Sequence, residues 1–459
     1  MSQPRLSEAS RWRIFGPVAT SAIALGLFSS INRPLLYDEF VYFMVGPLSF
    51  TETLSVVRDT TTNVNQGVTG AYLFSDWLLL QIFGASDVAL RLPSLVFGAA
   101  FLTYALIFLR LRGMGFVALT IFPIFMITQE LVMHYVGEAR TYMPLVASAV
   151  GLLAYYCAPE PFRKSPRGLA VAWSAAMIGV FFHPYIALYW PAVLLFGFLF
   201  FQRQHSLRNL ASFANPVLVL TGVATYTAIA ALTWIRGRAN ADVDPFNFLP
   251  GPLPVEILVQ NLYAFVNPAA VALVAAAVIS SLALTLIGAS GGVKRAVRSL
   301  AKDLLPPAVL FLLAFLAALA ISFTSIAADF WIFPRQWIAS AALAAIAIFW
   351  ASYVVIANAG VVSAGRKRLS AALLTVAVAV PASTVAAQQA RDLIEWSARP
   401  GEVAPTQAQL EDLQSEQQQL TDGQWMPFAQ VNADTGGRVW PEFRSYYLDT
   451  DWSTFFLQD

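Results

Sequence analysis

The chain has 459 residues, of which 58% are hydrophobic and 12% are charged. Soluble domains carry about 25% charged residues and about 45–50% apolar ones, so this composition excludes an ordinary soluble protein. The net charge of +1 gives no bulk attraction for nucleic acid, and the lone cysteine, Cys157, excludes an intramolecular disulfide and a thiolate metal cluster.

Long apolar stretches recur along the chain and predict membrane-spanning helices. Because a spanning helix needs about 20 mostly apolar residues, the sequence indicates an all-α, polytopic bundle of about eleven spans. The predicted spans are residues 14–32, 87–110, 114–131, 139–158, 168–183, 184–201, 213–234, 257–288, 304–324, 336–357 and 369–387. The two that flank His183 and Pro184 can also form one long kinked helix.

Basic residues alternate with acidic ones between these spans. Lys and Arg favour cytoplasmic loops, and they are concentrated at residues 5–13, 110–112, 163–167, 203–208, 294–302 and 366–368. The intervening loops hold the acidic residues Asp38, Glu39, Asp59, Glu138, Asp242, Asp244 and Asp329. This alternation predicts a cytoplasmic N-terminus in the inner membrane. It divides the chain into a membrane domain, residues 1–387, and a small periplasmic region, residues 388–459.

The first outer loop, residues 33–86, is too long for a simple turn. The stretch FTETLSVVRDTTTN predicts a short surface helix, with Ser49 or Thr51 as its N-cap. The stretch GAYLFSDWLLLQIFG is apolar but interrupted by Ser75 and Asp76. It predicts an interfacial or re-entrant helix, and a twelfth span is the alternative.

Two adjacent acids, Asp38 and Glu39, follow the first span in the stretch LLYDEFVYF. A carboxylate at a membrane surface can act as a general base toward a hydroxyl, or hold a divalent metal that bridges phosphates. The competing interpretation is that both acids only solvate or orient the loop. We predict that Asp38 and Glu39 are catalytic; no resident metal or other cofactor is required by any motif.

The stretch MHYVGEARTYMP lies at the outer end of a predicted span. Arg140 can pair with a phosphate or carboxylate, and Glu138 can orient a sugar hydroxyl. A simple interfacial salt bridge is the alternative. At the outward hinge before Pro184, His183 can contact a phosphate or remain a buried, hydrogen-bonded core residue.

The stretch FWIFPRQWIA begins another span on the outer side. The guanidinium fork of Arg335 matches phosphate oxygens, and Gln336 can hydrogen-bond a sugar or phosphate. The alternative for Arg335 is an interface anchor between Trp331 and Trp337. For Arg91, near the start of the second predicted span, pairing with Asp87 or anchoring at the interface is the favoured interpretation.

The stretches SDVALRLPSLVFG and GEARTYMPLVA, together with the acid pair, resemble bacterial membrane glycosyltransferases of the C superfamily. That group includes the protein O-mannosyltransferases and the aminoarabinose transferases. The resemblance covers residues 30–150; the rest matches only in architecture. Where the family has a HxPL or PPLyy stretch after the first outer helix, this chain has NQGVTGAYLF, a departure that affects the acceptor class.

The resemblance implies a helical membrane domain with two amphipathic helices in the first outer loop. It also implies a polyprenyl-phosphate-linked sugar as donor, a glycan, lipid or protein as acceptor, and Asp38 as the catalytic carboxylate. Arg140, Arg335 and His183 would then stabilise the departing phosphate, and one displacement would invert the anomeric centre. The alternatives are a transporter or flippase of lipid-linked saccharide, a ligase- or polymerase-like enzyme of O-antigen, and an inactive relative.

Overall fold

The structure is a computed structural model that describes five long stretches of the chain: residues 70–84, 87–202, 205–239, 293–328 and 334–359. It also describes residues 39, 49–51, 53–54, 262, 265, 378, 381–385, 387–388 and 391. Regular structure in these residues is helical, without strands, as the sequence predicts. The predicted span 14–32 lies outside the described residues, and so does nearly all of the predicted span 257–288 and of the C-terminal region 388–459.

Among the described residues, three helices are long and apolar enough to cross a membrane: α5 (Asp87–Leu111), α16 (Val293–Ala328) and α17 (Ile338–Ala359). They correspond to the predicted spans 87–110, 304–324 and 336–357. A fourth candidate is the bent pair of α12 (Leu207–Ala214) and α13 (Pro216–Ala239), whose axes differ by 66°. These helices support the membrane character of the chain, and the total of eleven spans stays a prediction.

The other apolar helices have 10–17 residues, and those in the predicted spans 114–131, 139–158 and 184–201 are shorter than predicted. They are α4 (Ala71–Phe83), α6 (Phe116–Ile127), α8 (Tyr142–Tyr156), α10 (Pro166–Phe182) and α11 (Ile186–Phe201). At a rise of about 1.5 Å per residue, none alone reaches the roughly 30 Å of a hydrocarbon core. Within the predicted span 114–131, α6 ends at Ile127, where the amide and the hydroxyl of Thr128 both donate to the Phe125 carbonyl, and α7 (Glu130–Val136) begins two residues after Thr128.

The chain breaks between α10 and α11 instead of forming one kinked helix. His183 has an extended backbone, with φ −155° and ψ 125°. A residue before proline is disfavoured in the α conformation, because the proline ring clashes with it, so Pro184 explains where α10 ends. The turn places the His183 ring at the exit of one apolar helix and the entrance of the next.

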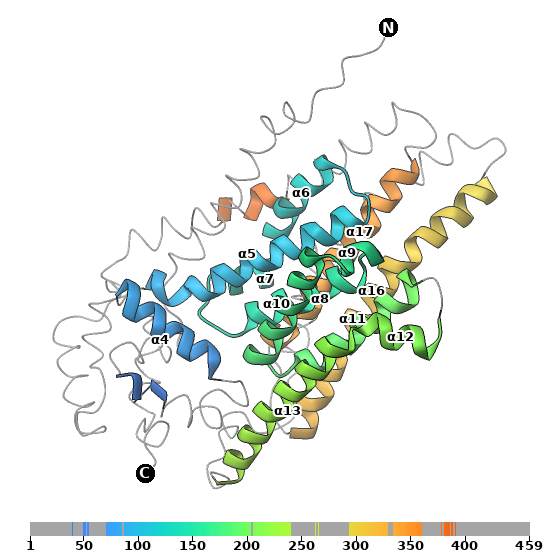
Figure 1. Ribbon diagram of the computed structural model, residues 1–459. Helices are drawn as coiled ribbons and strands as arrows, with labels where there is room; N and C mark the ends of the chain where they lie inside the picture. The colour runs from blue at the N-terminus through green and yellow to red at the C-terminus, as the bar shows by residue number, and fades with distance from the viewer. Residues whose placement is uncertain are drawn as a thin grey trace.

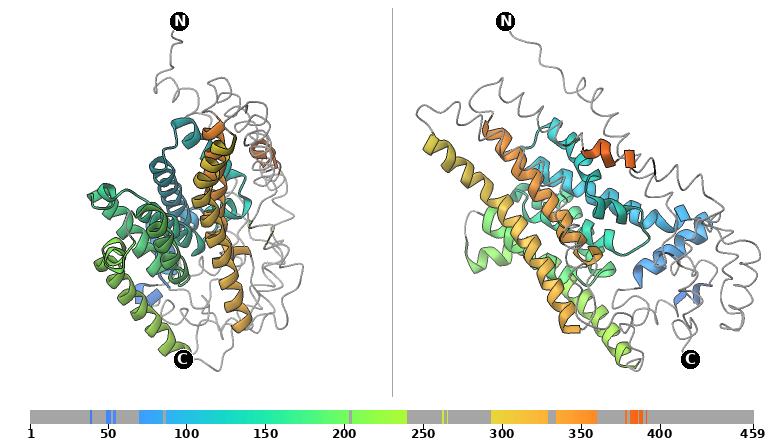
Figure 2. Two further views of the ribbon diagram at one scale, coloured as in Figure 1. Left: turned by 90° about the vertical axis from the view of Figure 1, so that its right-hand side faces the viewer. Right: turned by 180° about the vertical axis from the view of Figure 1, so that it is seen from behind.

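The core is organised around α8, in which all residues from Tyr142 to Tyr156 are buried. This helix packs against α5, α10, α11 and α17, in agreement with the rule that a helix apolar on all sides is buried. The approach of α11 is close: a Cβ at Gly197 would lie 2.7 Å from the Tyr156 carbonyl oxygen. Helices α16 and α17 run side by side along one flank (Figure 2).

The molecule has two chemically different ends (Figure 1). What we call the site end holds α4, α7, the loop 137–141, the α10–α11 turn and the 3₁₀ turn η1 (Pro334–Trp337). The opposite basic end holds the end of α5, α9 (Glu160–Arg163) and α12. Residues from loops predicted on opposite sides of the membrane therefore lie at opposite ends.

Candidate functional site

A buried ion pair joins Glu39 to α5. The Glu39 and Arg91 side chains are both fully buried, and the guanidinium forms two hydrogen bonds of 2.8 Å with the two carboxylate oxygens. Such a bidentate pair is charge-assisted and fixed in geometry. Glu39 is therefore a structural anchor, and Arg91 pairs with it; the sequence analysis had considered only Asp87 as a partner for Arg91.

The same carboxylate also positions the loop that carries Arg140. The Ala139 amide donates to Glu39 Oε1 at 3.0 Å. In α5, the Ser94 hydroxyl donates to the Glu138 carbonyl at 2.5 Å and lies 2.6 Å from the Tyr72 hydroxyl of α4. Three segments that are distant in sequence thus converge on residues 138–140 and hold their backbone in place.

Aromatic rings and cations surround this loop. The Tyr142 ring lies 5.1 Å from the Tyr135 ring and 5.7 Å from the His183 ring. The Arg140 guanidinium lies 5.9 Å from the centre of the Tyr142 ring. The loop, α7 and the α10–α11 turn therefore form one cluster.

The phenol of Tyr135 lies within electrostatic reach of both predicted phosphate ligands, Arg140 and Arg335. Burial raises the pKa of Tyr135 well above its usual value, and the charge of Glu138 adds to the rise. The positive charges of Arg335 and Arg140 lower the pKa of the same phenol. Both guanidinium groups therefore lie within electrostatic reach of one point, although nearly 200 residues separate them in sequence.

His183 is a neutral hydrogen-bonding group. Burial, and next the charge of Arg140, lowers its pKa to about 3. The Tyr185 amide donates to His183 Nδ1 at 3.2 Å, so Nδ1 is the acceptor and the ring proton is assigned to Nε2. His183 thus offers an N–H donor at physiological pH and does not add a positive charge.

Two further acids lie at the site end. Glu138 is buried, and its Oε2 lies 2.8 Å from His134 Nε2. Asp76 of α4 is fully buried, and neither of its oxygens has a hydrogen-bond partner among the described residues. Burial, and next the charge of Glu39, raises the pKa of Asp76 well above its usual value, so its environment favours the protonated form.

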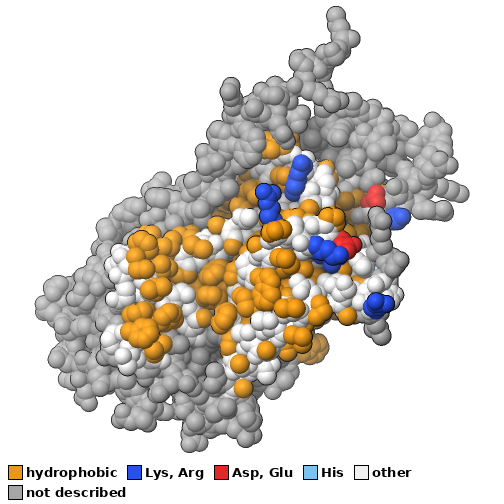
Figure 3. Space-filling model, viewed as in Figure 1, with side chains coloured by type: hydrophobic (Ala, Val, Ile, Leu, Met, Phe, Trp, Pro, Cys, Tyr) orange, Lys and Arg blue, Asp and Glu red, His pale blue; other side chains and the backbone are white. Residues whose placement is uncertain are grey.

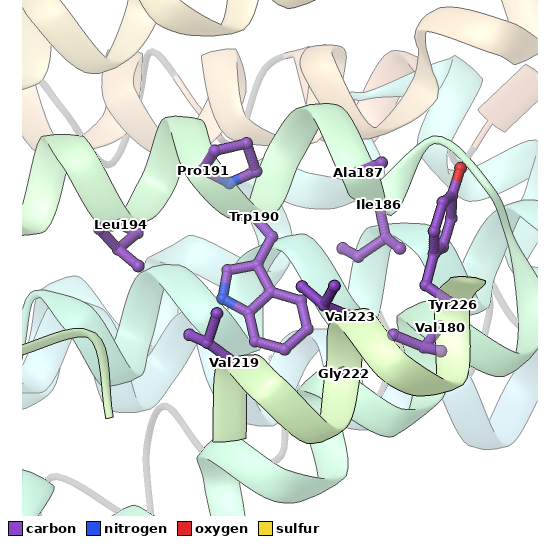
Figure 4. Close-up of a pocket in the computed structure, with 10 residues that line it drawn as sticks. All are labelled: Val180, Ile186, Ala187, Trp190, Pro191, Leu194, Val219, Gly222, Val223 and Tyr226. Atoms are coloured by element: carbon purple, nitrogen blue, oxygen red, sulfur yellow. The ribbon is translucent and has the colours of Figure 1, made fainter. Parts of the chain in front are cut away.

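An apolar cavity of about 290 Å³ lies between α11 and α13, next to the α10–α11 turn. Trp190 reaches from α11 across Gly222, and Ile186 and Tyr226 lie near the end of the cavity closest to that turn (Figure 4). Its lining is almost entirely hydrocarbon. Such a space accepts an alkyl or isoprenoid segment and not a sugar.

The predicted residues divide into three groups. Glu138, Arg140, His183 and Arg335 come together at the site end, where Gln336 is 9% exposed next to Arg335. Glu39 lies beside them as an anchor, and Asp38 lies outside the described residues. Within the described part of the chain, no three His, Cys, Asp or Glu side chains form a metal-binding group.

Three residues that contribute to this end were not singled out as site residues from sequence. Tyr135 and Ser94 have common residue types in ordinary patterns, so they give no signal until the contacts are known. Asp76 did carry a signal, because an acid in the middle of an apolar helix is expensive to bury. Comparison with protein families, with curated proteins and with solved structures finds no significant match for this chain.

Proposed function

We propose that the protein is a membrane glycosyltransferase that moves a sugar from a polyprenyl-phosphate donor to a glycan, lipid or protein acceptor on the non-cytoplasmic face. The observation that carries the proposal is the convergence of Arg140 and Arg335 on Tyr135, beside His183. Two guanidinium groups and a neutral N–H donor suit a phosphate whose negative charge grows as the sugar departs.

Asp38 is the proposed base in this reaction. It precedes Glu39, whose carboxylate is fixed to Arg91 and to the Ala139 amide. Both Glu39 oxygens are engaged, so proton transfer falls to Asp38. Asp38 takes the proton of the acceptor hydroxyl while that oxygen attacks the anomeric carbon, and the phosphate leaves with the bonding electrons. A single displacement inverts the anomeric centre.

The apolar cavity supports a lipid-linked donor. It begins beside Ile186, the first residue of α11, only a short turn after His183. A polyprenyl phosphate has an anionic head and a hydrocarbon chain, and this end of the molecule offers cations and an apolar space close together. A water-soluble nucleotide sugar would have no use for such a cavity.

The distribution of charged residues favours the transferase over a transporter. Transporters place ionisable side chains near the bilayer midplane. In α5, α16 and α17 the charged residues lie toward the helix ends. They are Asp87, Arg91 and Arg110 in α5, and Lys294, Arg295, Arg298, Lys302 and Asp303 in the first third of α16, whereas α17 contains no Asp, Glu, Lys or Arg. Binding and chemistry at one surface fit this distribution better than passage through the centre.

Transfer in proteoliposomes tests the proposal. Purified protein is supplied with polyprenyl-phosphate-linked hexoses and pentoses and a membrane extract as the acceptor source, and released polyprenyl phosphate is measured. We expect turnover by the wild type and a loss of roughly 10²–10⁴ in rate for Asp38→Asn, the usual effect of removing a general base. Glu160→Gln, a fully exposed acid at the basic end, is the control. No release by the wild type with any donor, or equal rates in Asp38→Asn, contradicts the proposal.

A further inference from the structure

Two arginines at the basic end are held against aromatic rings. The Arg112 guanidinium lies 4.0 Å from the centre of the Phe201 ring, and the Arg163 guanidinium lies 4.0 Å from the centre of the Phe213 ring. Arg112 also donates to the Cys157 carbonyl, and Arg163 donates to the Phe213 carbonyl at 3.5 Å. Stacking and backbone bonds fix both groups, unlike the mobile cations usual at a membrane surface.

The two guanidinium groups flank one point. Both act electrostatically on the thiol of Cys157, the residue that ends α8. They come from different segments, since Arg112 follows α5 and Arg163 ends α9. Each is fixed by its own ring and backbone contacts, and both lie within electrostatic reach of the C-terminus of a core helix.

Acidic groups do not balance this pair in the described part of the chain. The acid that acts on Arg163 is Glu160, which is exposed and already lies 2.6 Å from Lys164 Nζ. No carboxylate contributes to the electrostatic environment of Arg112. Burial lowers the pKa of both arginines, because each has lost much of its water; the charge of Glu160 offsets this only in part at Arg163.

We propose that Arg112 and Arg163 form a binding site for the phosphodiester headgroup of an anionic membrane phospholipid. The visible Lys and Arg side chains gather at this end, while the remaining described surface in the same view is largely apolar (Figure 3). The adjacent helix α12 is amphipathic: Phe213 is buried, Arg208 is exposed, and the helix bends 66° from α13. A helix of this kind lies in the plane of the headgroups. A phosphodiester there supplies the negative charge that the arginines lack.

The site is independent of the proposed transferase site, which lies at the opposite end of the helices. It also differs from general attraction between a basic surface and an anionic membrane. Diffuse attraction depends on the number of charges, whereas a built site depends on which arginines are present. Arg110 and Arg167 lie at the same end, are exposed and contact no ring in the described structure, so they serve as matched controls.

Native mass spectrometry of the full-length protein in detergent tests the site, with phosphatidylglycerol, phosphatidylcholine and inorganic phosphate as probes. We expect the wild type to retain phosphatidylglycerol selectively. In Arg112→Gln/Arg163→Gln, retention should fall at least about tenfold, because charge-assisted fork contacts are lost. Arg110→Gln/Arg167→Gln removes the same charge and should stay within about twofold, as expected of screened surface cations.

Several results would overturn the site. An equal loss in both double variants would show diffuse attraction, and full displacement of the lipid by millimolar inorganic phosphate would show a site for the free ion. Equal retention of phosphatidylglycerol and phosphatidylcholine by the wild type would remove any headgroup preference. This last comparison needs no variant, so it can overturn the site even if Arg112→Gln/Arg163→Gln does not fold.

Discussion

At the scale of single residues, the buried ion pair of Glu39 and Arg91 should contribute most to the stability of the site end. Removing one member of a buried ion pair leaves the other charge uncompensated and costs about 3–5 kcal/mol. We therefore expect Arg91→Ala to lower the melting temperature in detergent sharply. Arg91→Lys should be intermediate, since it keeps the charge but loses the two-pronged contact.

The double variant Glu39→Met/Arg91→Met provides the matching control. It removes both charges and fills the space with apolar atoms, so it should recover much of the stability lost in Arg91→Ala. If the double variant melts no higher than Arg91→Ala, burial of an unpaired charge is not the cause of the loss. If Arg91→Ala melts like the wild type, the pair is not an anchor.

His183 should make stability depend on pH in a defined window. Its pKa of about 3 in the folded protein lies below the ordinary value of 6.5. Below pH 6.5, His183 binds a proton in the unfolded chain, whereas in the folded chain it stays unprotonated until the pH approaches 3. Stability is therefore complete above that pH and falls by up to about 1.4 kcal/mol per pH unit toward pH 3.

His183→Gln should lack this component. The measurement is the difference in unfolding free energy between the wild type and His183→Gln from pH 7.5 to 4.5. As the pH falls, the unfolding free energy of the wild type should decrease steadily relative to that of His183→Gln. A difference that stays constant over the range would mean that His183 titrates normally in the folded state.

At the scale of elements, the contact of α8 with α11 depends on a missing side chain. Gly197→Ala would place a Cβ 2.7 Å from the Tyr156 carbonyl oxygen. Overpacking of this kind costs about 1–3 kcal/mol, against about 1 kcal/mol gained from the better helix propensity of alanine. We expect a net loss in melting temperature. Gly115→Ala meets no atom within 4 Å and should change little; equal effects of the two changes would contradict the close approach.

The sequence predicts the existence of these elements better than their ends. Hydropathy finds the apolar segments because burial in lipid or protein requires them. It does not separate a helix that crosses the bilayer from a shorter one buried in protein, so the predicted span 139–158 appears as the fifteen-residue core helix α8. The sequence leaves open whether Pro184 kinks one long helix or separates two, because a proline can do either. The extended backbone of His183 shows that α10 ends there.

At the scale of the whole molecule, the separation of the two ends predicts sidedness. Cys157 is 1% exposed, so the native thiol should stay unreactive. A cysteine can replace Phe83, which is 62% exposed at the site end, or Lys164, whose side chain is 75% exposed at the basic end. In intact cells an impermeant maleimide should label Phe83→Cys, and Lys164→Cys only after permeabilisation. The reverse result would invert the orientation, and labelling of both in intact cells would contradict a bundle with its ends on opposite sides.

The site was partly predictable for a reason that concerns the whole molecule. The alternation of charge predicts that Glu138, Arg140, His183 and Arg335 lie on one side of the membrane, and the structure brings them to one end. The side of the membrane on which residues lie does not specify their contacts, however. The pairing of Arg91 with Glu39 and the position of Tyr135 near both Arg140 and Arg335 could therefore not be found from sequence. Those depend on which helices pack against α8, and each pairing joins residues far apart in the chain.

The central claim is that the site end holds a lipid-linked phosphate, and the affinity for polyprenyl phosphate tests it most directly. The probe is common to all sugars, so the unknown donor does not matter. We expect Arg335→Ala and Arg140→Ala each to weaken binding at least about tenfold, and Arg335→Lys to recover it only in part, because lysine cannot reproduce the guanidinium fork. Arg167→Ala, at the basic end, should bind like the wild type. Unchanged affinity in Arg335→Ala and Arg140→Ala, or an equal loss in Arg167→Ala, would contradict the account.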